Sequence, residues 1–372
     1  MKIGSVKESS DLRVAITPEV AKSYMDIGYR VVLEHGYADH LYSVQDYTQV
    51  GVVFDEKKNV CNVDILVQVY CPDNDVCLNL SDLILICFLQ PFHTQDHLIK
   101  LKENNVTCFS MELVPRSTIA QKMDALSSQA SLSGYVSVVL AASKLSKVFP
   151  MMVTPAGTLK PTKVLVIGAG VAGLQAIATA KRLGAQVSAY DTRAIAKEQV
   201  NSLGAKFLNI DVGNKAQTKQ GYAKQLSAEQ LKLQQKMLED ACIQSDVIIT
   251  TAQVFSKRAP VIVTNSMIIK MKQGSVIVDC AVESGGNVEG VQEDNEIMIG
   301  EVLVLGYSNL AQKVAAHASQ MYAKNVYEFI LECFNVESGK LLISYDHEVA
   351  ESMLVVNNKE IVHKLILELM NL

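Results

Sequence analysis

Three glycines form a pattern that could bind a dinucleotide. Gly168, Gly170 and Gly173 follow the G-x-G-x-x-G spacing directly after the β-branched run 163–167. In this pattern the first glycine permits a tight turn, the second lets a pyrophosphate approach the backbone, and the third lets the next helix pack close to the sheet. The free N–H groups at the start of that helix, predicted over 172–183, would hold the pyrophosphate.

Asp191 stands at the end of the next predicted strand, 186–190. An acidic side chain here accepts hydrogen bonds from the ribose hydroxyls of adenosine and repels a 2′-phosphate. The pattern therefore favours NAD(H) over NADP(H). A glycine-rich turn without a ligand is the alternative, and the order of strand, glycines, helix, strand and acid makes it the weaker one.

A second candidate group lies on a helix predicted to start near Met123. Asp124, Ser127 and Ser128 stand at positions i, i+3 and i+4, so a carboxylate and two hydroxyls share one helix face. Such a face could hold a polar ligand. Capping and ordinary helix-surface roles explain the same residues equally well.

Composition indicates a soluble globular protein. The chain has 372 residues, enough for two domains, with 49% hydrophobic and 20% charged residues. A net charge of -5 gives no reason to expect nucleic acid as a partner. The longest apolar run, 83–89, is far shorter than the roughly 20 residues that span a bilayer, and no apolar region of a signal peptide follows the first residues. The eight cysteines form no C-x-x-C pair, so we expect reduced thiols and no metal site.

The elements that must position these residues alternate between strands and helices, which predicts parallel sheets. In the N-terminal half we expect strands at 2–6, 31–34, 65–69, 83–88 and 107–110, with helices at 43–50 and 96–104. In the C-terminal half we expect strands at 163–167, 186–190, 203–207, 246–251, 275–279 and 302–305. A long amphipathic helix is predicted over 312–334, and the segment 150–162 is expected to be a linker.

The fold class that follows is α/β, with two Rossmann-like domains of doubly wound, mainly parallel sheets joined by long helices. Residues 131–311 would form the NAD(H)-binding domain. Residues 1–130 would form the N-terminal domain, which residues 312–372 would complete. A helix at about 123–146 would link the two. The polar insertion 214–239 departs from this plan, and is either a functional flap or a passive surface loop.

Seven segments together resemble the alanine dehydrogenase / NAD(P) transhydrogenase family and cover almost all of the chain. In order, they are KE…RVAITPEV, PRSTIAQKMDALSSQA, VLVIGAGVAGLQAI, AYDTRAIAKEQVNSLGAKF, GYAKQLS, VDCAVESGGNVEG and GYSNLAQKVAAHASQMYAKN. Within the family they are most similar to domain I, the NAD(H)-binding portion of the alpha subunit of proton-translocating transhydrogenases.

The two branches of the family need different side chains. The resemblance implies that an alanine dehydrogenase has a lysine and a histidine beside the nicotinamide, and an arginine for the substrate carboxylate. Arg13 is present, but Tyr70 replaces the lysine and Gln90 replaces the histidine. Neither side chain is a proton donor poised near neutral pH, so the amino-acid reaction is not expected. A non-catalytic NAD(H)-sensing module is a third hypothesis. Such a module would have no use for Gln121, so the presence of Gln121 argues against it.

The transhydrogenase branch implies direct hydride transfer between NAD(H) on this chain and NADP(H) on domain III of a partner subunit. By this resemblance Arg116, Asp124 and Ser127 would hold the nicotinamide ribose and carboxamide. Gln121 would reach toward the partner's NADP(H). Together with Arg116, Asp124 and Ser127, Gln121 would form the catalytic set. The resemblance adds these cofactor-binding residues: Ser117, Thr118, Gly168, Gly170, Val171, Gly173, Asp191, Thr192, Arg193, Gly221 and Tyr222.

The resemblance also implies how the chain is assembled. The polar insertion, with Gly221 and Tyr222, matches a mobile loop that closes over bound nucleotide. We expect a homodimer and a transmembrane subunit that couples hydride transfer to proton translocation, because the membrane parts would lie on other chains. The protein would then be cytoplasmic and peripheral on the inner membrane. Two segments depart from the family pattern: 117–119, and Thr250–Pro260, which predicts an altered lining under the nucleotide.

Overall fold

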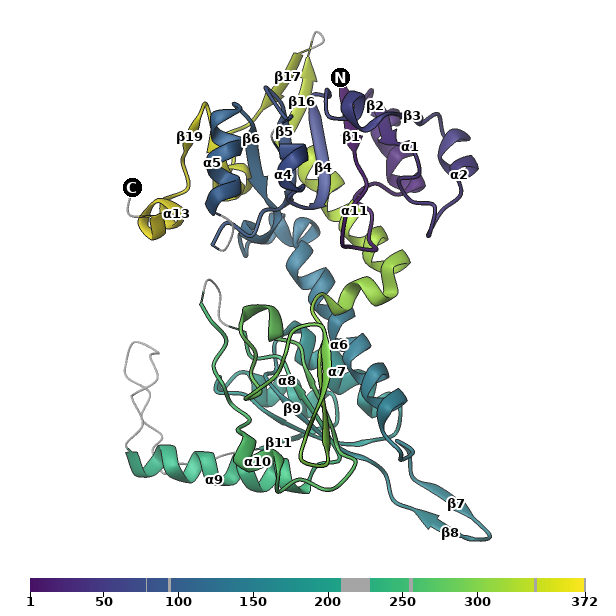
Figure 1. Cartoon of the computed structure of the whole chain (residues 1–372), viewed down its shortest axis with the longest axis vertical. Helices are drawn as coiled ribbons and strands as arrows, with labels where there is room; N and C mark the ends of the chain where they lie inside the picture. Colours follow the sequence, from purple (N-terminus) through teal and green to yellow (C-terminus); the bar gives the residue numbers. More distant parts are fainter. Residues whose placement is uncertain (78, 93–94, 209–227, 254–256, 338–339, 371–372) are drawn as a thin grey trace. The chain divides into compact units, whose positions relative to one another are not determined.

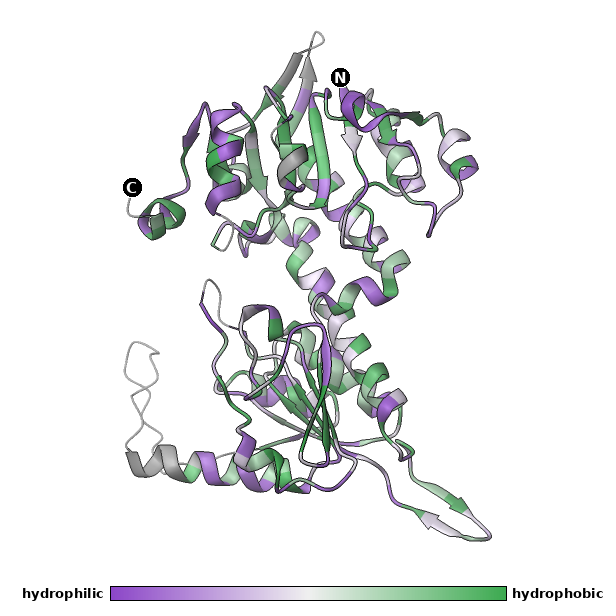
Figure 2. Ribbon diagram, in the orientation of Figure 1, coloured by the Kyte–Doolittle hydropathy of each residue, from purple (hydrophilic) through white to green (hydrophobic). Residues whose placement is uncertain are grey.

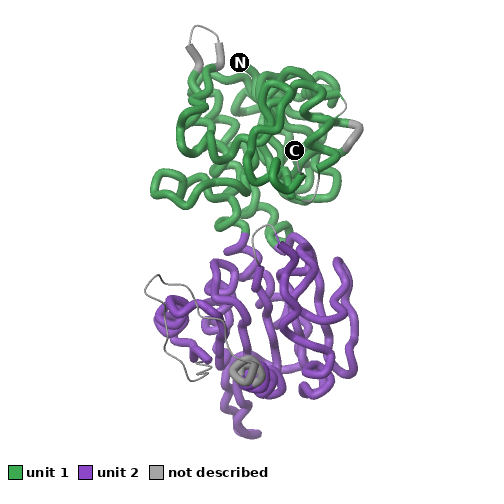
Figure 3. The backbone as a smooth tube through the Cα atoms, turned by 90° about the vertical axis from the view of Figure 1, so that its left-hand side faces the viewer, with its two compact units in different colours: residues 1–129, 311–372 green, residues 130–310 purple. Residues whose placement is uncertain are grey.

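Two largely parallel sheets organise the chain, one in each of two units (Figure 3). The first unit comprises Met1–Gln129 with Ala311–Leu372, and the second comprises Ala130–Leu310. The computed structural model describes residues 1–77, 79–92, 95–208, 228–253, 257–337 and 340–370.

The first unit holds an eight-stranded sheet in the order β19-β18-β6-β5-β4-β1-β2-β3 (Figure 1). The strands from β1 to β6 are all parallel and have the order 3-2-1-4-5-6 of a dinucleotide-binding fold. β18 and β19 extend the sheet in antiparallel orientation, so both ends of the chain form it. The strands are β1 (Lys2–Ser5), β2 (Arg30–Glu34), β3 (Val53–Asp55), β4 (Ile65–Tyr70), β5 (Ile84–Phe88), β6 (Thr107–Ser110), β18 (Leu354–Asn357) and β19 (Glu360–Ile361).

The second unit holds a seven-stranded sheet in the order β11-β10-β9-β12-β13-β15-β14, again 3-2-1-4-5-6 in its parallel portion. The strands are β9 (Lys163–Ile167), β10 (Gln186–Tyr190), β11 (Lys206–Phe207), β12 (Val247–Thr250), β13 (Val276–Asp279), β14 (Asn295–Ile299) and β15 (Val302–Gly306). β14 is an antiparallel edge strand that the sequence pattern missed, because its side chains are only partly buried or exposed. The predicted α/β fold class is confirmed.

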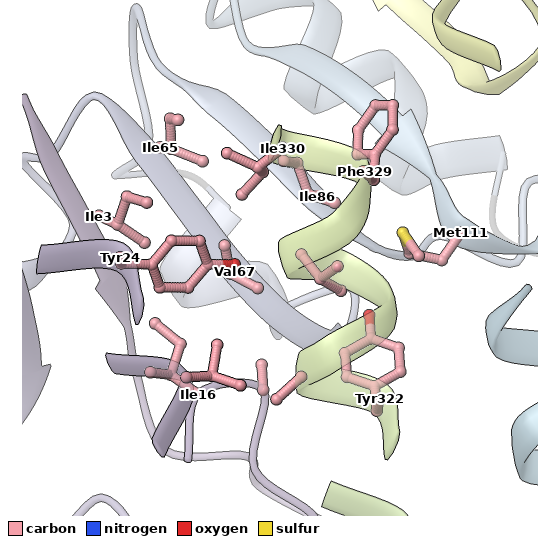
Figure 4. Close-up of a cluster of buried hydrophobic side chains, with 14 of the residues drawn as sticks. Ile3, Ile16, Tyr24, Ile65, Val67, Ile86, Met111, Tyr322, Phe329 and Ile330 are labelled. Atoms are coloured by element: carbon pink, nitrogen blue, oxygen red, sulfur yellow. The ribbon is translucent and has the colours of Figure 1, made fainter. Parts of the chain in front are cut away.

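Helices cover both faces of the first sheet. On one face α1 (Pro18–Asp26) and α11 (Ala315–Cys333) pack their buried aromatic side chains, among them Tyr24, Tyr322 and Phe329, against the strands (Figure 4). On the other face the cover is α3 (Lys57–Val60), α4 (Asn74–Cys77), α5 (Gln95–Glu103) and α13 (Lys364–Met370). The predicted amphipathic helix over 312–334 is present, but its first residues belong to a 3-10 turn, Leu310–Val314.

The remaining helices are α2 (Val44–Thr48), α6 (Ala125–Lys144), α7 (Val171–Arg182), α8 (Ala196–Ser202), α9 (Ala228–Gln244), α10 (Asn265–Ile268) and α12 (Glu348–Met353). α6 runs from the first unit into the second, and in the described portion of the chain it is the one helix long and apolar enough to cross a bilayer by length and composition alone. Its middle is packed within the second unit, where a side chain at Gly134 would overlap the backbone of Ala172. α6 therefore packs directly against the start of α7 there.

The segment 150–162 is not a plain linker, so that prediction was wrong. It forms an antiparallel hairpin of β7 (Met152–Thr154) and β8 (Gly157–Leu159), and every strand residue is exposed. The hairpin extends away from its own unit (Figure 1). Its strands are too short to show an alternating pattern, although Pro155 and Gly157 are typical turn residues.

Candidate functional site

The glycine turn lies between β9 and α7, at the carboxyl edge of the second sheet. Gly168 has φ +96°, a conformation that favours glycine, and its N–H donates to the Tyr190 carbonyl at 2.8 Å. α7 begins at Val171 with Gly170 as its N-cap, and no side chain among the described residues caps its first turn. The N–H groups of that turn are therefore left to an anion such as a pyrophosphate.

The three glycines differ in what a side chain at each position would meet. A Cβ at Gly168 would lie 2.6 Å from Thr251 Oγ1, and a Cβ at Gly173 would overlap the Gly168 carbonyl. Protein packing alone therefore explains these two. A Cβ at Gly170 would meet no atom of the described residues within 4 Å, and its φ of -77° suits any residue. The open space at Gly170 fits a ligand that approaches the backbone.

Asp191 joins the end of β10 to the glycine turn. Its Oδ2 accepts from the Ala169 N–H at 2.7 Å and from Arg193 Nη2 at 2.9 Å. Its Oδ1 accepts from Arg193 N at 2.8 Å and Nε at 3.0 Å. Burial opposes ionisation of Asp191, but these hydrogen bonds outweigh it, so the pKa of the carboxyl lies below its ordinary value. A ribose hydroxyl would replace a guanidinium donor here, because the Arg193 side chain is 56% exposed and Asp191 only 7%.

The residues predicted around Gln121 lie in the first unit, on the loop 116–118, a 3-10 turn (Ile119–Met123) and the start of α6. Asp124 caps α6, since its oxygens accept from Ser127 N at 2.8 Å and Ser127 Oγ at 2.6 Å. Capping, one of the two interpretations of the sequence, is thus a role that these residues have. Ser117 Oγ is buried and has no hydrogen-bond partner among the described residues, which marks it for a ligand or a water.

The other predicted residues are placed as follows. Arg116, Thr118 and Gln121 are exposed in the first unit, and Val171 and Thr192 are exposed in the second. Gly221 and Tyr222, on the predicted flap, lie outside the described residues. Within the described ranges, no cluster of three or more His, Cys, Asp or Glu residues could hold a metal.

The arginine that a dehydrogenase would use for a substrate carboxylate is already paired within the first unit. Arg13 is 1% exposed, and its Nε and Nη2 donate to the two oxygens of Asp11 at 3.0 and 2.7 Å. Its Nη1 donates to Gln129 Oε1 at 2.8 Å, and its guanidinium lies 5.3 Å from the centre of the Tyr70 ring. The Asp11 carboxylate thus already makes the bidentate pair with the Arg13 guanidinium. The sequence showed Arg13 but not this pairing, which a carboxylate two residues away could have suggested.

Comparison with known proteins identifies similar chains along the whole length. Residues 4–133 match the family described as "Alanine dehydrogenase/PNT, N-terminal domain", and residues 137–364 match "Alanine dehydrogenase/PNT, C-terminal domain". The chain is 40% identical to a protein of Rickettsia prowazekii named as the first portion of NAD(P) transhydrogenase subunit alpha, over 99% of this chain and 98% of that protein. It is 35% identical to "NAD(P) transhydrogenase subunit alpha" of Haemophilus influenzae, over 97% of this chain and 71% of that protein.

Two solved structures share the fold. The transhydrogenase from Sinorhizobium meliloti superposes with a TM-score of 0.85 and 35% identity, covering 98% of this chain and all of that one. An L-alanine dehydrogenase superposes with a TM-score of 0.81 over 100% of this chain and 99% of that one. At 22% identity, the second match shows the fold alone.

The open space at Gly170 gives a first prediction. Gly170→Ala should leave the free energy of unfolding nearly unchanged but weaken NADH binding roughly tenfold or more, because the methyl group would lie where the pyrophosphate approaches. Gly173→Ala is the matched control, and should destabilise the fold by about 1–3 kcal/mol or more through overpacking. Chemical denaturation and NADH fluorescence titration measure the two quantities. Unchanged NADH binding in Gly170→Ala would argue against a nucleotide at this turn.

Asp191 gives a second prediction. Asp191→Asn keeps one oxygen for the Ala169 N–H but removes the charge, so NADH should bind about tenfold or more weakly. NADPH should bind more tightly relative to NADH, because Arg193 loses its carboxylate partner and can pair with a 2′-phosphate. Titration of both nucleotides against the wild type and the variant gives the ratio. The same NADH-to-NADPH preference in both would show that Asp191 does not select the nucleotide.

Proposed function

Since this chain belongs to the alanine dehydrogenase/PNT family, we propose that it is the NAD(H)-binding component of a transhydrogenase. In this proposal hydride passes directly between NAD(H) on this chain and NADP(H) on a partner subunit. The observation that carries it is the glycine turn, where an uncapped helix start and open space at Gly170, among the described residues, fit a pyrophosphate. The family that these motifs suggested is confirmed by the matches to its N- and C-terminal domains.

For direct hydride transfer the protein must orient the two nicotinamides, bring them close together and exclude water. It needs no general acid or base. Bound NAD(H) supplies the hydride chemistry itself. The glycine turn would hold the pyrophosphate, and Asp191, Thr192 and Arg193 the adenosine ribose. Through the family likeness we assign the nicotinamide end to the loop residues of the first unit, and the contact with NADP(H) to the exposed Gln121. The assigned loop residues are Arg116, Ser117, Thr118, Asp124 and Ser127.

An alanine dehydrogenase activity is less well supported. Arg13 is buried and bound to Asp11 and Gln129, so a substrate carboxylate would have to displace a bidentate ion pair. Tyr70 and Gln90 supply no proton donor near neutral pH. A non-catalytic NAD(H)-sensing module is the other alternative, in which no partner binds NADP(H) and Gln121 would have no role.

The proposal includes partners. Several relatives are named as subunits, and one is named as the first portion of an alpha subunit, which supports a multi-subunit assembly. We propose that a partner domain III binds NADP(H) and that a transmembrane subunit couples hydride transfer to proton translocation. This chain would lie on the cytoplasmic side and reach the inner membrane through those partners.

We also propose that the chain forms a homodimer through the β7–β8 hairpin. Four apolar side chains of this hairpin and its base are exposed: Met151 by 63%, Met152 by 43%, Val153 by 74% and Leu159 by 49%. Figure 2 shows that β7 is hydrophobic although it extends away from its unit. Within the described residues, each of the two strands also pairs on one side only, which leaves an edge that a second copy could cover.

Hydride transfer tests the proposal. With a recombinant NADP(H)-binding domain III and NADP(H) added, the chain should transfer hydride from NADH to an oxidised NAD analogue, and neither component should do so alone. Gln121→Asn should lower the rate at least about tenfold with NADH binding unchanged, because a shortened side chain misplaces its amide by about 1 Å or more. Lys122→Gln, at an adjacent exposed position, is the control and should keep the rate.

The other functions give different results in the same experiment. Intact NADH binding without activity on mixing would favour the sensing module. Turnover of pyruvate, ammonia and NADH by the chain alone would establish the dehydrogenase instead and refute the transhydrogenase proposal.

The hairpin gives a separate prediction. Val153→Asp should convert the dimer to monomers at micromolar concentration, because an unpaired carboxylate would be buried in the contact, at a loss of several kcal/mol. Ile269→Asp is the matched control, because Ile269 is also an exposed apolar residue of the second unit, at 65%. Sedimentation velocity reports the mass, and NADH binding reports the fold. A monomeric wild type, or a dimeric Val153→Asp variant, would refute the role of the hairpin.

A further inference from the structure

A buried asparagine ties a loop to the carboxyl edge of the second sheet. The side chain of Asn287 binds both backbone groups of Ala252: its Oδ1 accepts from the N–H, and its Nδ2 donates to the carbonyl, each at 2.9 Å. Nδ2 also donates to the Pro260 carbonyl at 2.9 Å. Asn287 is fully buried, so water does not reach its amide group, and these bonds satisfy the donor and the acceptor of that group. The amide therefore fixes the position of Ala252.

Asn287 is itself held by the sheet. Its N–H donates at 2.7 Å to Oδ2 of Asp279, the last residue of β13. The same carboxylate accepts from the Val288 N–H at 3.0 Å, from the Ala281 N–H at 2.9 Å and from Thr250 Oγ1 at 3.0 Å. Asp279 is fully buried. Its carboxylate therefore holds both the end of β12, through Thr250, and the segment 281–288 that follows β13.

The residue before Ala252 touches the glycine turn. Thr251 donates its N–H to the Ile167 carbonyl at 2.8 Å and its Oγ1 to the Gly168 carbonyl at 3.1 Å. That same oxygen lies 2.6 Å from the place where a Cβ of Gly168 would be, and 3.0 Å from that of Gly173. One hydroxyl thus contacts two glycines of the pattern.

We propose that Thr251 and Asn287 are positioning residues for the dinucleotide. The Asn287 amide fixes Ala252, this places the Thr251 hydroxyl, and the hydroxyl holds the Gly168 carbonyl with the turn presented to the pyrophosphate. The inference rests on the proposed binding of NAD(H) at this turn. It also explains how Thr250–Pro260, which departs from the family pattern, keeps the turn in place: its first residues are bound by Asn287 and Asp279.

The test compares hydroxyl loss with hydroxyl retention. Thr251→Val keeps the shape and removes the donor, and it should weaken NADH binding about five- to tenfold, the effect of one hydrogen bond. Thr251→Ser keeps the donor and should bind NADH like the wild type. Thr162→Val is the control, because Thr162 also lies in the second unit and donates its Oγ1 to a backbone carbonyl, that of Val148, at 2.8 Å. It should lower stability without changing NADH binding.

A coupled variant tests the order of the contacts. Asn287→Asp replaces the Nδ2 donor by an oxygen that faces two carbonyls, so it should weaken NADH binding as well. If Asn287 acts through Thr251, adding Thr251→Val to Asn287→Asp should cause little further loss, because the two effects are not additive. If Asn287→Asp does not fold, the Thr251 series decides alone.

The outcomes separate this inference from the proposed function. Wild-type binding of NADH by Thr251→Val would overturn the positioning role and leave the proposed function standing. Equal losses in Thr251→Val and Thr162→Val would also overturn it, because the effect would then be general destabilisation. A wild-type chain that binds no NADH would overturn the proposed function, and this inference with it.

Discussion

The close approach of backbone segments at the glycine turn is the constraint on which the second unit depends. Gly173 lies against the Gly168 carbonyl, so α7 sits directly on the turn that precedes it. Gly134 brings α6 equally close to α7 at Ala172. Such contacts leave no room for a Cβ, and they fix the start of α7, whose N–H groups no described side chain caps, at the carboxyl edge of the sheet.

The two sheets share a strand order but differ at the corresponding switch point. In the first unit the loop after β1 places Glu8 against the end of β4, where its Oε1 accepts from Val69 N at 2.6 Å and Gln68 Nε2 at 3.1 Å. Burial raises the pKa of Glu8 to about 8. The Val69 N–H at this edge is thus bound by a side chain of the chain itself. The helix that follows β1 also differs from α7, because Thr17 Oγ1 accepts from the Val20 N–H at 3.3 Å and caps the first turn of α1.

Local signals predicted much of this structure, and long-range pairing accounts for most of what they missed. The strands 163–167 and 186–190 appear with the predicted bounds, because glycines and the acid delimit them. The pairing of β18 with β6, which joins Leu354 to Phe109, has no local signal. At the site, the glycine spacing was readable, whereas the bond from Arg13 to Gln129 spans 116 residues and could not be read from spacing.

If NAD(H) binds as proposed, the Arg193–Asp191 pair would make recognition of a ribose an exchange of partners. The carboxylate has about four acceptor positions, and Ala169 and Arg193 already donate to it four times. In that proposal a diol would enter as the guanidinium leaves, so the buried charge would not lose all of its donors. Added salt then acts in two opposed ways: it screens the ion pair that must open, and it screens the attraction between the freed arginine and the phosphates of the arriving nucleotide. The ionic-strength dependence of affinity at this site is therefore expected to be shallow.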